Sequence, residues 1–167
     1  MKLRWWYGIV CNMILAALVI SGAVFFTTHI RGKNYFLEIR DAGSGKLCGK
    51  WPLEAADEFS VEFIHSVHQS PVRESFTIEN NMIRPVSVRF SSFGAGMQSD
   101  LEEGQALSRI GDELLITGFN STYTELNYIV GTVSDHLLYI KNEKVSLQGL
   151  CGKNAHITVR YNEGRKK

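Results

Sequence analysis

Residues 58–83 read EFSVEFIHSVHQSPVRESFTIENNMI, and this stretch decides the fold. Apolar side chains occupy every second position on both sides of a short polar break, which predicts two half-buried β-strands. Each apolar series has one polar exception on the face that should meet the core, His65 in the first segment and Glu74 in the second. The sequence therefore predicts a β-hairpin that carries one imidazole and one carboxylate on its inner face.

The pairing of the hairpin follows from its loop. If residues 68–71 form a four-residue loop, Phe63 faces Phe76 and His65 faces Glu74 across the two strands. Burial favours a neutral histidine, whereas a neighbouring carboxylate favours the imidazolium form. Two interpretations of this pair stay open, a buried polar contact that fixes the strand register and a functional site.

The same period of two recurs along the rest of the chain, without heptads, internal repeats or a long amphipathic helix. Further strands are predicted at residues 34–40, 46–53, 86–90, 114–117, 126–130, 138–140, 145–147 and 155–161. Residues 98–104 are predicted to form an acidic loop that could hold a short helix near 100–103. The prediction is an all-β domain over residues 34–162, a sandwich or partly closed barrel of about eight to ten short antiparallel strands.

An apolar segment precedes this domain. Residues 9–26 are almost wholly apolar and, at about 1.5 Å per residue, nearly span a hydrocarbon core of about 30 Å. We therefore predict one N-terminal transmembrane helix within residues 1–30, with the β domain on the extracytoplasmic side. The alternative is a signal peptide cleaved near Ala23, because residues 21–23 are small. The run exceeds the usual signal core of about 7–15 residues, which favours the anchor.

The charge distribution excludes one class of partner. The chain carries 18 Lys and Arg against 17 Asp and Glu, and four of the basic residues precede the first acid, Glu38. The β domain is therefore mildly acidic and has no basic face for nucleic acid. The basic tail at residues 163–167 is typical of a solvated chain end.

Two cysteines lie in the β domain, Cys48 near its start and Cys151 before its last strand. In an oxidising compartment a disulfide between them could join the two ends of the fold. The alternative is that both are ordinary small buried residues. The sequence leaves the two interpretations equally open.

The segment Gly94-Ala95-Gly96 interrupts the alternation. Its glycines allow a tight bend or a concave row of backbone N–H groups that could hold an anion. The bend is the simpler interpretation, because no phosphate-binding motif accompanies the glycines. Residues 94–96 are nevertheless kept as a candidate anion loop.

Three motifs resemble a known family. The run Phe63-Ile64-His65-Ser66-Val67, the pair Pro71-Val72 followed by Glu74, and Phe93-Gly94-Ala95-Gly96 are similar to a bacterial family called domain of unknown function 1850. The likeness covers about residues 37–159. Members are often encoded beside TRAP-type uptake transporters of the TAXI class, so the resemblance implies an accessory role at the membrane. It carries over no catalytic residues.

Two functions from different classes follow. The first is a non-enzymatic, membrane-tethered accessory protein that docks on a TAXI-type TRAP transporter or on its binding protein. The second is a module that binds a small anion or organic acid near His65, Glu74 and residues 94–96. A hydrolase is less well supported, because adjacent residues such as His65 and Ser66 point to opposite faces of a strand. For the same reason His65 and His68 predict no metal site, and we assign no cofactor.

Overall fold

The computed structural model describes residues 35–67, 69–91 and 100–164. These described residues belong to one compact unit. The described residues contain the following strands and one short helix: β1 (Tyr35–Asp41), β2 (Leu47–Pro52), β3 (Glu58–Ile64), β4 (Pro71–Glu79), β5 (Met82–Phe90), β6 (Ala106–Ile110), β7 (Glu113–Thr117), β8 (Glu125–Ile129), β9 (Leu137–Ile140), β10 (Glu143–Ser146), α2 (Leu147–Cys151) and β11 (His156–Glu163). The prediction of an all-β domain is confirmed.

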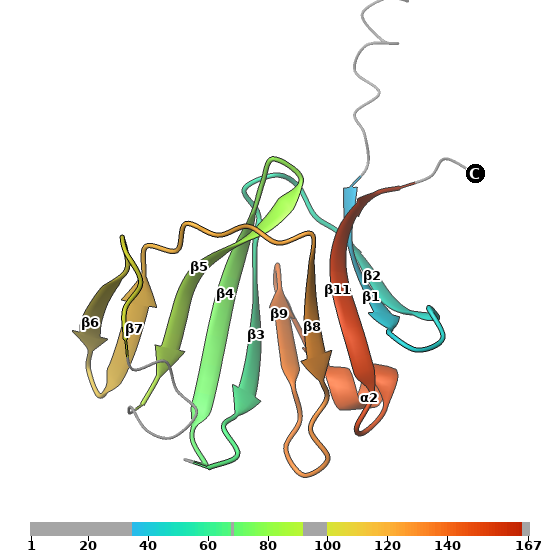
Figure 1. Ribbon diagram of the computed structural model, residues 1–167. Coiled ribbons are helices and arrows are strands. Elements are labelled where there is room, and N and C mark those ends of the chain that lie inside the picture. The colour runs from blue at the N-terminus through green and yellow to red at the C-terminus, as the bar shows by residue number, and fades with distance from the viewer. Residues whose placement is uncertain (1–34, 68, 92–99, 165–167) are drawn as a thin grey trace, which may run out of the picture. The chain divides into compact units, whose positions relative to one another are not determined.

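The strands form two antiparallel sheets that do not close into a barrel (Figure 1). The small sheet has the order β2-β1-β11-β8, and the large sheet has the order β10-β9-β3-β4-β5-β7-β6. Figure 1 shows β7 and β6 extending beyond the strands of the small sheet. The architecture is therefore a sandwich in which one end of the large sheet has no strand opposite it.

The core lies where the two sheets face each other. Fully buried apolar side chains from both sheets form one cluster that includes Leu37, Ile39, Phe59, Val61, Leu138, Ile140, Ile157 and Val159. At roughly 1.5–3 kcal/mol for each fully buried large apolar side chain, this cluster is the main source of stability. A smaller cluster of Val72, Phe90 and Ile116 lies toward the other end of the large sheet.

The predicted hairpin is present as β3 and β4, but its predicted register is wrong by four residues. Phe63 pairs with Val72 and not with Phe76, which pairs instead with Phe59. Because side chains on a strand alternate with a period of two, a shift by an even number leaves each of them on its predicted face. The alternation therefore could not distinguish the two registers.

The shift separates the two residues that were expected to face each other. Glu74 pairs with Val61, whereas His65 follows the last residue of β3. The His65 N–H donates to the Ser70 carbonyl at 2.9 Å, and the Gln69 N–H donates to the His65 carbonyl at 2.8 Å. These bonds close the hairpin earlier than predicted, so the cross-strand pairing of His65 with Glu74 is wrong.

Three other features differ from the sequence prediction. Strand β6 was not expected, Leu147 begins a helical turn and does not continue a strand, and residues 100–104 hold no helix. The helical turn is capped by Ser146, whose Oγ accepts from the Gly149 N–H at 2.8 Å. A capped single turn is too short to show a helical period in the sequence.

The predicted membrane anchor at residues 9–26, the cleavage position near Ala23 and the end of the basic tail lie outside the described residues. Within the described part of the chain, no helix has the length and apolar character needed to cross a membrane.

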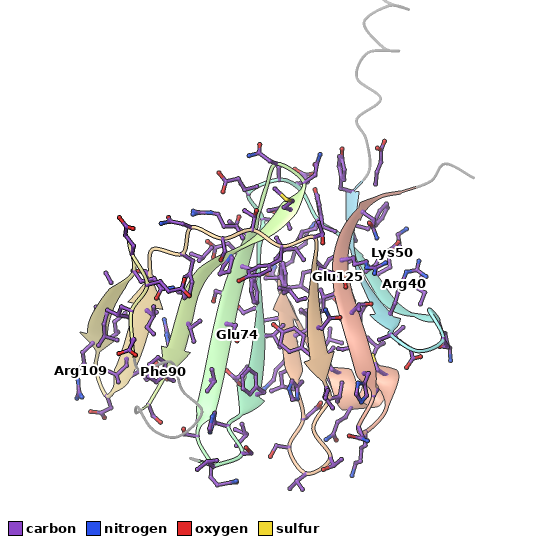
Figure 2. All side chains as sticks on the ribbon, viewed as in Figure 1. Arg40, Lys50, Glu74, Phe90, Arg109 and Glu125 are labelled. Carbon is purple, nitrogen blue, oxygen red and sulfur yellow. The ribbon has the colours of Figure 1, made fainter. Side chains whose placement is uncertain are left out.

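Glu38 on β1 is a buried acid of the small sheet, and it gathers several donors. It accepts from Lys50 Nζ at 3.0 Å, from Arg40 Nη2 at 2.9 Å and from Asn162 Nδ2 at 3.4 Å. Burial alone would raise the pKa of this carboxyl, but these hydrogen bonds outweigh burial and hold its pKa below the ordinary value. Figure 2 shows Arg40 and Lys50 close together beside β1 and β2.

We predict that Glu38→Gln lowers the free energy of unfolding by about 1 kcal/mol at pH 7, because Arg40 and Lys50 remain about one-third exposed and can regain water. The pKa of Glu38 is depressed in the folded state, so its contribution is present above the unfolded pKa and disappears as pH falls through the folded pKa. Urea unfolding at pH 7 and pH 3 measures this difference. Glu58→Gln at an exposed strand end is the control, and equal losses in the two variants would contradict the prediction.

Candidate ligand site between the two sheets

Glu74 occupies the middle of an otherwise apolar row on the inner face of the large sheet. Strand pairing places it between Val61 and Val88, and the same row continues through Leu138 and Ile116. Figure 2 shows Glu74 near the middle of β4. The alternation of β4 thus directs a carboxyl group toward the space between the sheets, where an apolar side chain is the rule.

A tyrosine from the opposite sheet meets this carboxyl group. Tyr128 on β8 donates a hydrogen bond from its hydroxyl to Glu74 Oε2 at 2.8 Å. Neither Glu74 nor Tyr128 is fully buried. The bond therefore links the small sheet to the large sheet through two polar groups at the margin of the core.

Burial shifts both groups toward their neutral forms. It raises the pKa of Glu74, and the hydrogen bond from Tyr128 offsets only part of that rise. Burial, together with the nearby charge of Glu74, raises the pKa of Tyr128 well above its ordinary value. Tyr128 consequently stays a hydrogen-bond donor at physiological pH, and Glu74 takes up a proton more readily than an exposed glutamate.

These two residues line a pocket of about 340 Å³ between the sheets. Most of the lining residues are apolar or aromatic, although polar atoms contribute nearly half of the wall surface. The lining residues come from β4, β5, β8 and the connection between β7 and β8. They are Glu74, Phe76, Pro85, Ser87, Val88, Phe119, Tyr123, Leu126, Asn127 and Tyr128. The volume is at the small end of the range for ligand sites, about 300–1,000 Å³.

A β-bulge shapes the β5 wall of this pocket. Ser75 pairs with Ser87 while Phe76 pairs with Pro85, so Val86 has no partner in β4. An extra residue bends its strand locally and interrupts the alternation of its side chains. Pro85, Ser87 and Val88 consequently all line the pocket, although they are near neighbours in sequence.

The connection from β7 to β8 forms the rim. Tyr123 exchanges two backbone hydrogen bonds with Ile83 of β5, at 2.7 and 2.8 Å. Arg84 Nη1 also donates to the Phe119 carbonyl at 3.3 Å. These bonds attach the segment between β7 and β8 to β5. The segment carries two aromatic lining residues, Phe119 and Tyr123, which are thereby held at the rim.

The carboxyl group of Glu74 has one oxygen available to a ligand. Among the described residues, its side chain accepts only the hydrogen bond from Tyr128, which uses Oε2. The described lining residues include no Lys, Arg or His. The pocket therefore offers Oε1 as an acceptor with aromatic surface around it, an arrangement that suits a hydrogen-bond donor or a cation.

His136 supports Tyr128 from the side. Its ring stacks on Phe63 with centroids 5.3 Å apart and meets the Tyr128 ring edge-on at 6.2 Å. The Gly131 N–H donates to His136 Nδ1 at 3.1 Å, which requires that nitrogen to be unprotonated. Burial lowers the pKa of His136, in agreement with a neutral ring. His136 is thus a positioning residue that holds the tyrosine ring.

The structure separates His65 from Glu74. His65 lies in the β3–β4 turn, where its Nδ1 accepts from the Val67 N–H at 3.3 Å. Residues 94–96 and His68 lie outside the described residues. Within the described ranges no group of three or more His, Cys, Asp or Glu residues could hold a metal ion.

Sequence reasoning identified Glu74 but missed its partner. Tyr128 belongs to an alternating series with Leu126 and Val130, so its inward direction was predictable from the sequence. An inward tyrosine needs a partner for its hydroxyl, and the carboxyl of Glu74 was the natural acceptor to propose. His136 gave no such signal, because it precedes β9 in a loop.

The fold and the pocket define this molecule as an all-β sandwich domain with a polar site between its sheets. The family model described as Domain of unknown function (DUF1850) matches residues 59–147, and the chain belongs to that family. No curated protein and no solved structure matches the chain. The matched residues run from β3 to the first residue of α2 and include every described residue that lines the pocket.

We predict that Glu74→Ala lowers the free energy of unfolding by about 1–3 kcal/mol, because the Tyr128 hydroxyl loses its acceptor. Glu74→Gln keeps an acceptor and removes the buried charge, so it should cost less. Since the folded pKa of Glu74 is raised, the ionised form costs stability as pH rises from the unfolded pKa through the folded pKa. In urea melts, the free energy of unfolding of Glu74→Gln should therefore rise relative to that of the wild type between pH 4 and pH 8. Equal and negligible losses for both variants at either pH would contradict this prediction.

Proposed function

We propose that this chain is a non-enzymatic accessory protein held at the membrane, and that its β domain binds a small organic molecule in the pocket between the sheets. The observation that carries the binding function is the Glu74 carboxyl, which lines the pocket between the sheets and has one oxygen available to a ligand. A carboxyl group in such a position is costly for folding alone, and a ligand that donates to it would offset that cost.

The lining defines the class of ligand. A donor or ammonium group would bind Glu74 Oε1, and an apolar or aromatic body would lie against Phe76, Phe119 and Tyr123. The volume of about 340 Å³ suits a molecule of metabolite size and not a peptide. We therefore propose a small organic amine as the ligand.

This ligand differs in charge from the small anion or organic acid expected from the sequence. That expectation placed the anion near His65, Glu74 and residues 94–96. The register places His65 beyond the end of β3, and residues 94–96 lie outside the described residues. Glu74 without that imidazole repels a carboxylate once it is ionised. The pocket therefore supports a binding module, but for a positively charged or neutral donor.

The cellular setting is the second part of the proposal. The apolar run at residues 9–26 would tether the domain, and a signal anchor of this kind would place it on the extracytoplasmic side. The family resemblance supports a partner among the subunits of a TAXI-type TRAP uptake transporter. In this setting the β domain would present or sense a solute next to the transporter.

The ligand prediction is tested with three probes of the same shape and different charge: phenethylammonium, 2-phenylethanol and phenylacetate. We expect the ammonium probe to bind the full chain in detergent most tightly and phenylacetate least tightly, as measured by calorimetry at pH 8. Glu74→Gln should lower the affinity for the ammonium probe at least about tenfold, because it removes the charge that binds the ammonium group.

Glu58→Gln is the matched control, since Glu58 lies on the adjacent strand β3, is exposed and does not line the pocket. The control should bind like the wild type. Equal binding of the three probes, or an unchanged affinity in Glu74→Gln, would refute the ligand assignment and leave the membrane role to be judged separately.

We predict that the full chain co-purifies from membranes with subunits of the transporter and that its deletion reduces solute uptake. A version in which another transmembrane segment replaces residues 1–30 should restore uptake, because the β domain carries the proposed function. Unchanged uptake after deletion, together with failure to recover any transporter subunit, would argue against the accessory role.

A further inference from the structure

The two edge strands of the small sheet differ in their surroundings: the pocket lies beside β8, and the side at β2 is closed. Helix α2 follows β10 of the large sheet and contacts β2, the edge strand of the small sheet. Trp51 Nε1 on β2 donates to Glu143 Oε2 on β10 at 3.0 Å. The edge strands β2 and β10 are thus connected by a helix and a hydrogen bond, whereas the pocket lies beside β8, the other edge of the small sheet.

Two cysteines lie at this closed side. Cys48 is on β2 and Cys151 is the last residue of α2, and both side chains are half-buried against the main core cluster. The strand and the helix are close there, because a Cβ at Gly49 would come within 2.9 Å of Leu150 Cδ2. Gly49 is the chain neighbour of Cys48 and Leu150 is the chain neighbour of Cys151, so both cysteines lie at this contact, and no disulfide joins them in this structure.

We propose that Cys48 and Cys151 form a redox-sensitive disulfide that fastens the edge of the small sheet to α2 and so locks the closed side of the sandwich. From the sequence alone, a disulfide and two unlinked buried cysteines were equally plausible. The fold supports a site for oxidation, because β2 and the end of α2, which are far apart in the chain, pack against each other beside the two cysteines.

The reaction uses a disulfide donor, either a protein disulfide or oxidised glutathione. One thiolate attacks a sulfur of the donor and releases one donor thiol, and the second cysteine then displaces the other. Two cysteine thiols are oxidised to one disulfide, the donor disulfide is reduced to two thiols, and the two protons pass to the released thiolates. Burial and the neighbouring Cys48 raise the pKa of Cys151 to about 12, so Cys48 is the expected first nucleophile.

The bond would enclose roughly 100 residues, which include the whole family-matched segment 59–147. Cross-linking a loop of this length restricts the unfolded chain strongly. The disulfide should therefore act on stability, while the pocket at the other edge of the small sheet keeps its geometry. Its formation in cells would also require an oxidising compartment, as the proposed extracytoplasmic location provides.

The test uses the full chain in detergent with Cys11→Ala, which leaves the two cysteines of the β domain. The protein is incubated with oxidised glutathione, free thiols are alkylated after unfolding, and linked peptides are identified by mass spectrometry. We expect a Cys48–Cys151 cross-link, and we expect dithiothreitol to lower the melting temperature by about 10 °C.

Cys48→Ala combined with Cys151→Ala is the control, and its melting temperature should not respond to dithiothreitol. Two alkylated thiols after oxidation, or glutathione retained on one cysteine without ring closure, would overturn the proposal. If the cross-link forms but dithiothreitol does not change the melting temperature, the locking role is overturned. None of these outcomes depends on whether the pocket binds an amine.

Discussion

The hydrogen bond from Tyr128 to Glu74 is the interaction on which this account depends. It joins a central strand of the large sheet to an edge strand of the small sheet, at 2.8 Å, within a row of side chains that is otherwise apolar. A carboxyl group in such a row is tolerated only where a donor or solvent reaches it. Tyr128 satisfies one oxygen and the other has no partner among the described residues, so Glu74 contributes both to the contact between the sheets and to the proposed ligand site.

The two lateral sides of the sandwich differ in structure. On one side α2, Trp51 and Glu143 connect the edges of the two sheets, and Cys48 on β2 and Cys151 of α2 lie in the same region. On the other side β8 ends the small sheet, while the large sheet continues into β7 and β6. The bulge at Val86 bends β5 next to this open side. A rigid side opposite an open one is a suitable frame for a small ligand site.

The sequence predicted which face of a strand each side chain occupies, but not which residue on the neighbouring strand it pairs with. The period of two placed Phe59, Val61, Phe76 and Glu74 on the inner face, and the structure agrees. It could not fix the register of β3 against β4, because a shift of four residues preserves the period. The predicted partner of Glu74 therefore came from the adjacent strand, although its actual partner comes from the opposite sheet. The alternation predicts that Tyr128 faces inward, but it gives no distance between two residues of opposite sheets.

The central claim concerns the protonation of one carboxyl group, and it is tested most directly by following the Glu74 side-chain carbon by NMR through a pH titration. We expect Glu74 to titrate above the ordinary glutamate value of about 4.3, because burial raises its pKa. In Tyr128→Phe the pKa should rise further, since the hydrogen bond that favours the ionised form is lost. An ordinary or lowered pKa in the wild type, or no change in Tyr128→Phe, would contradict the account.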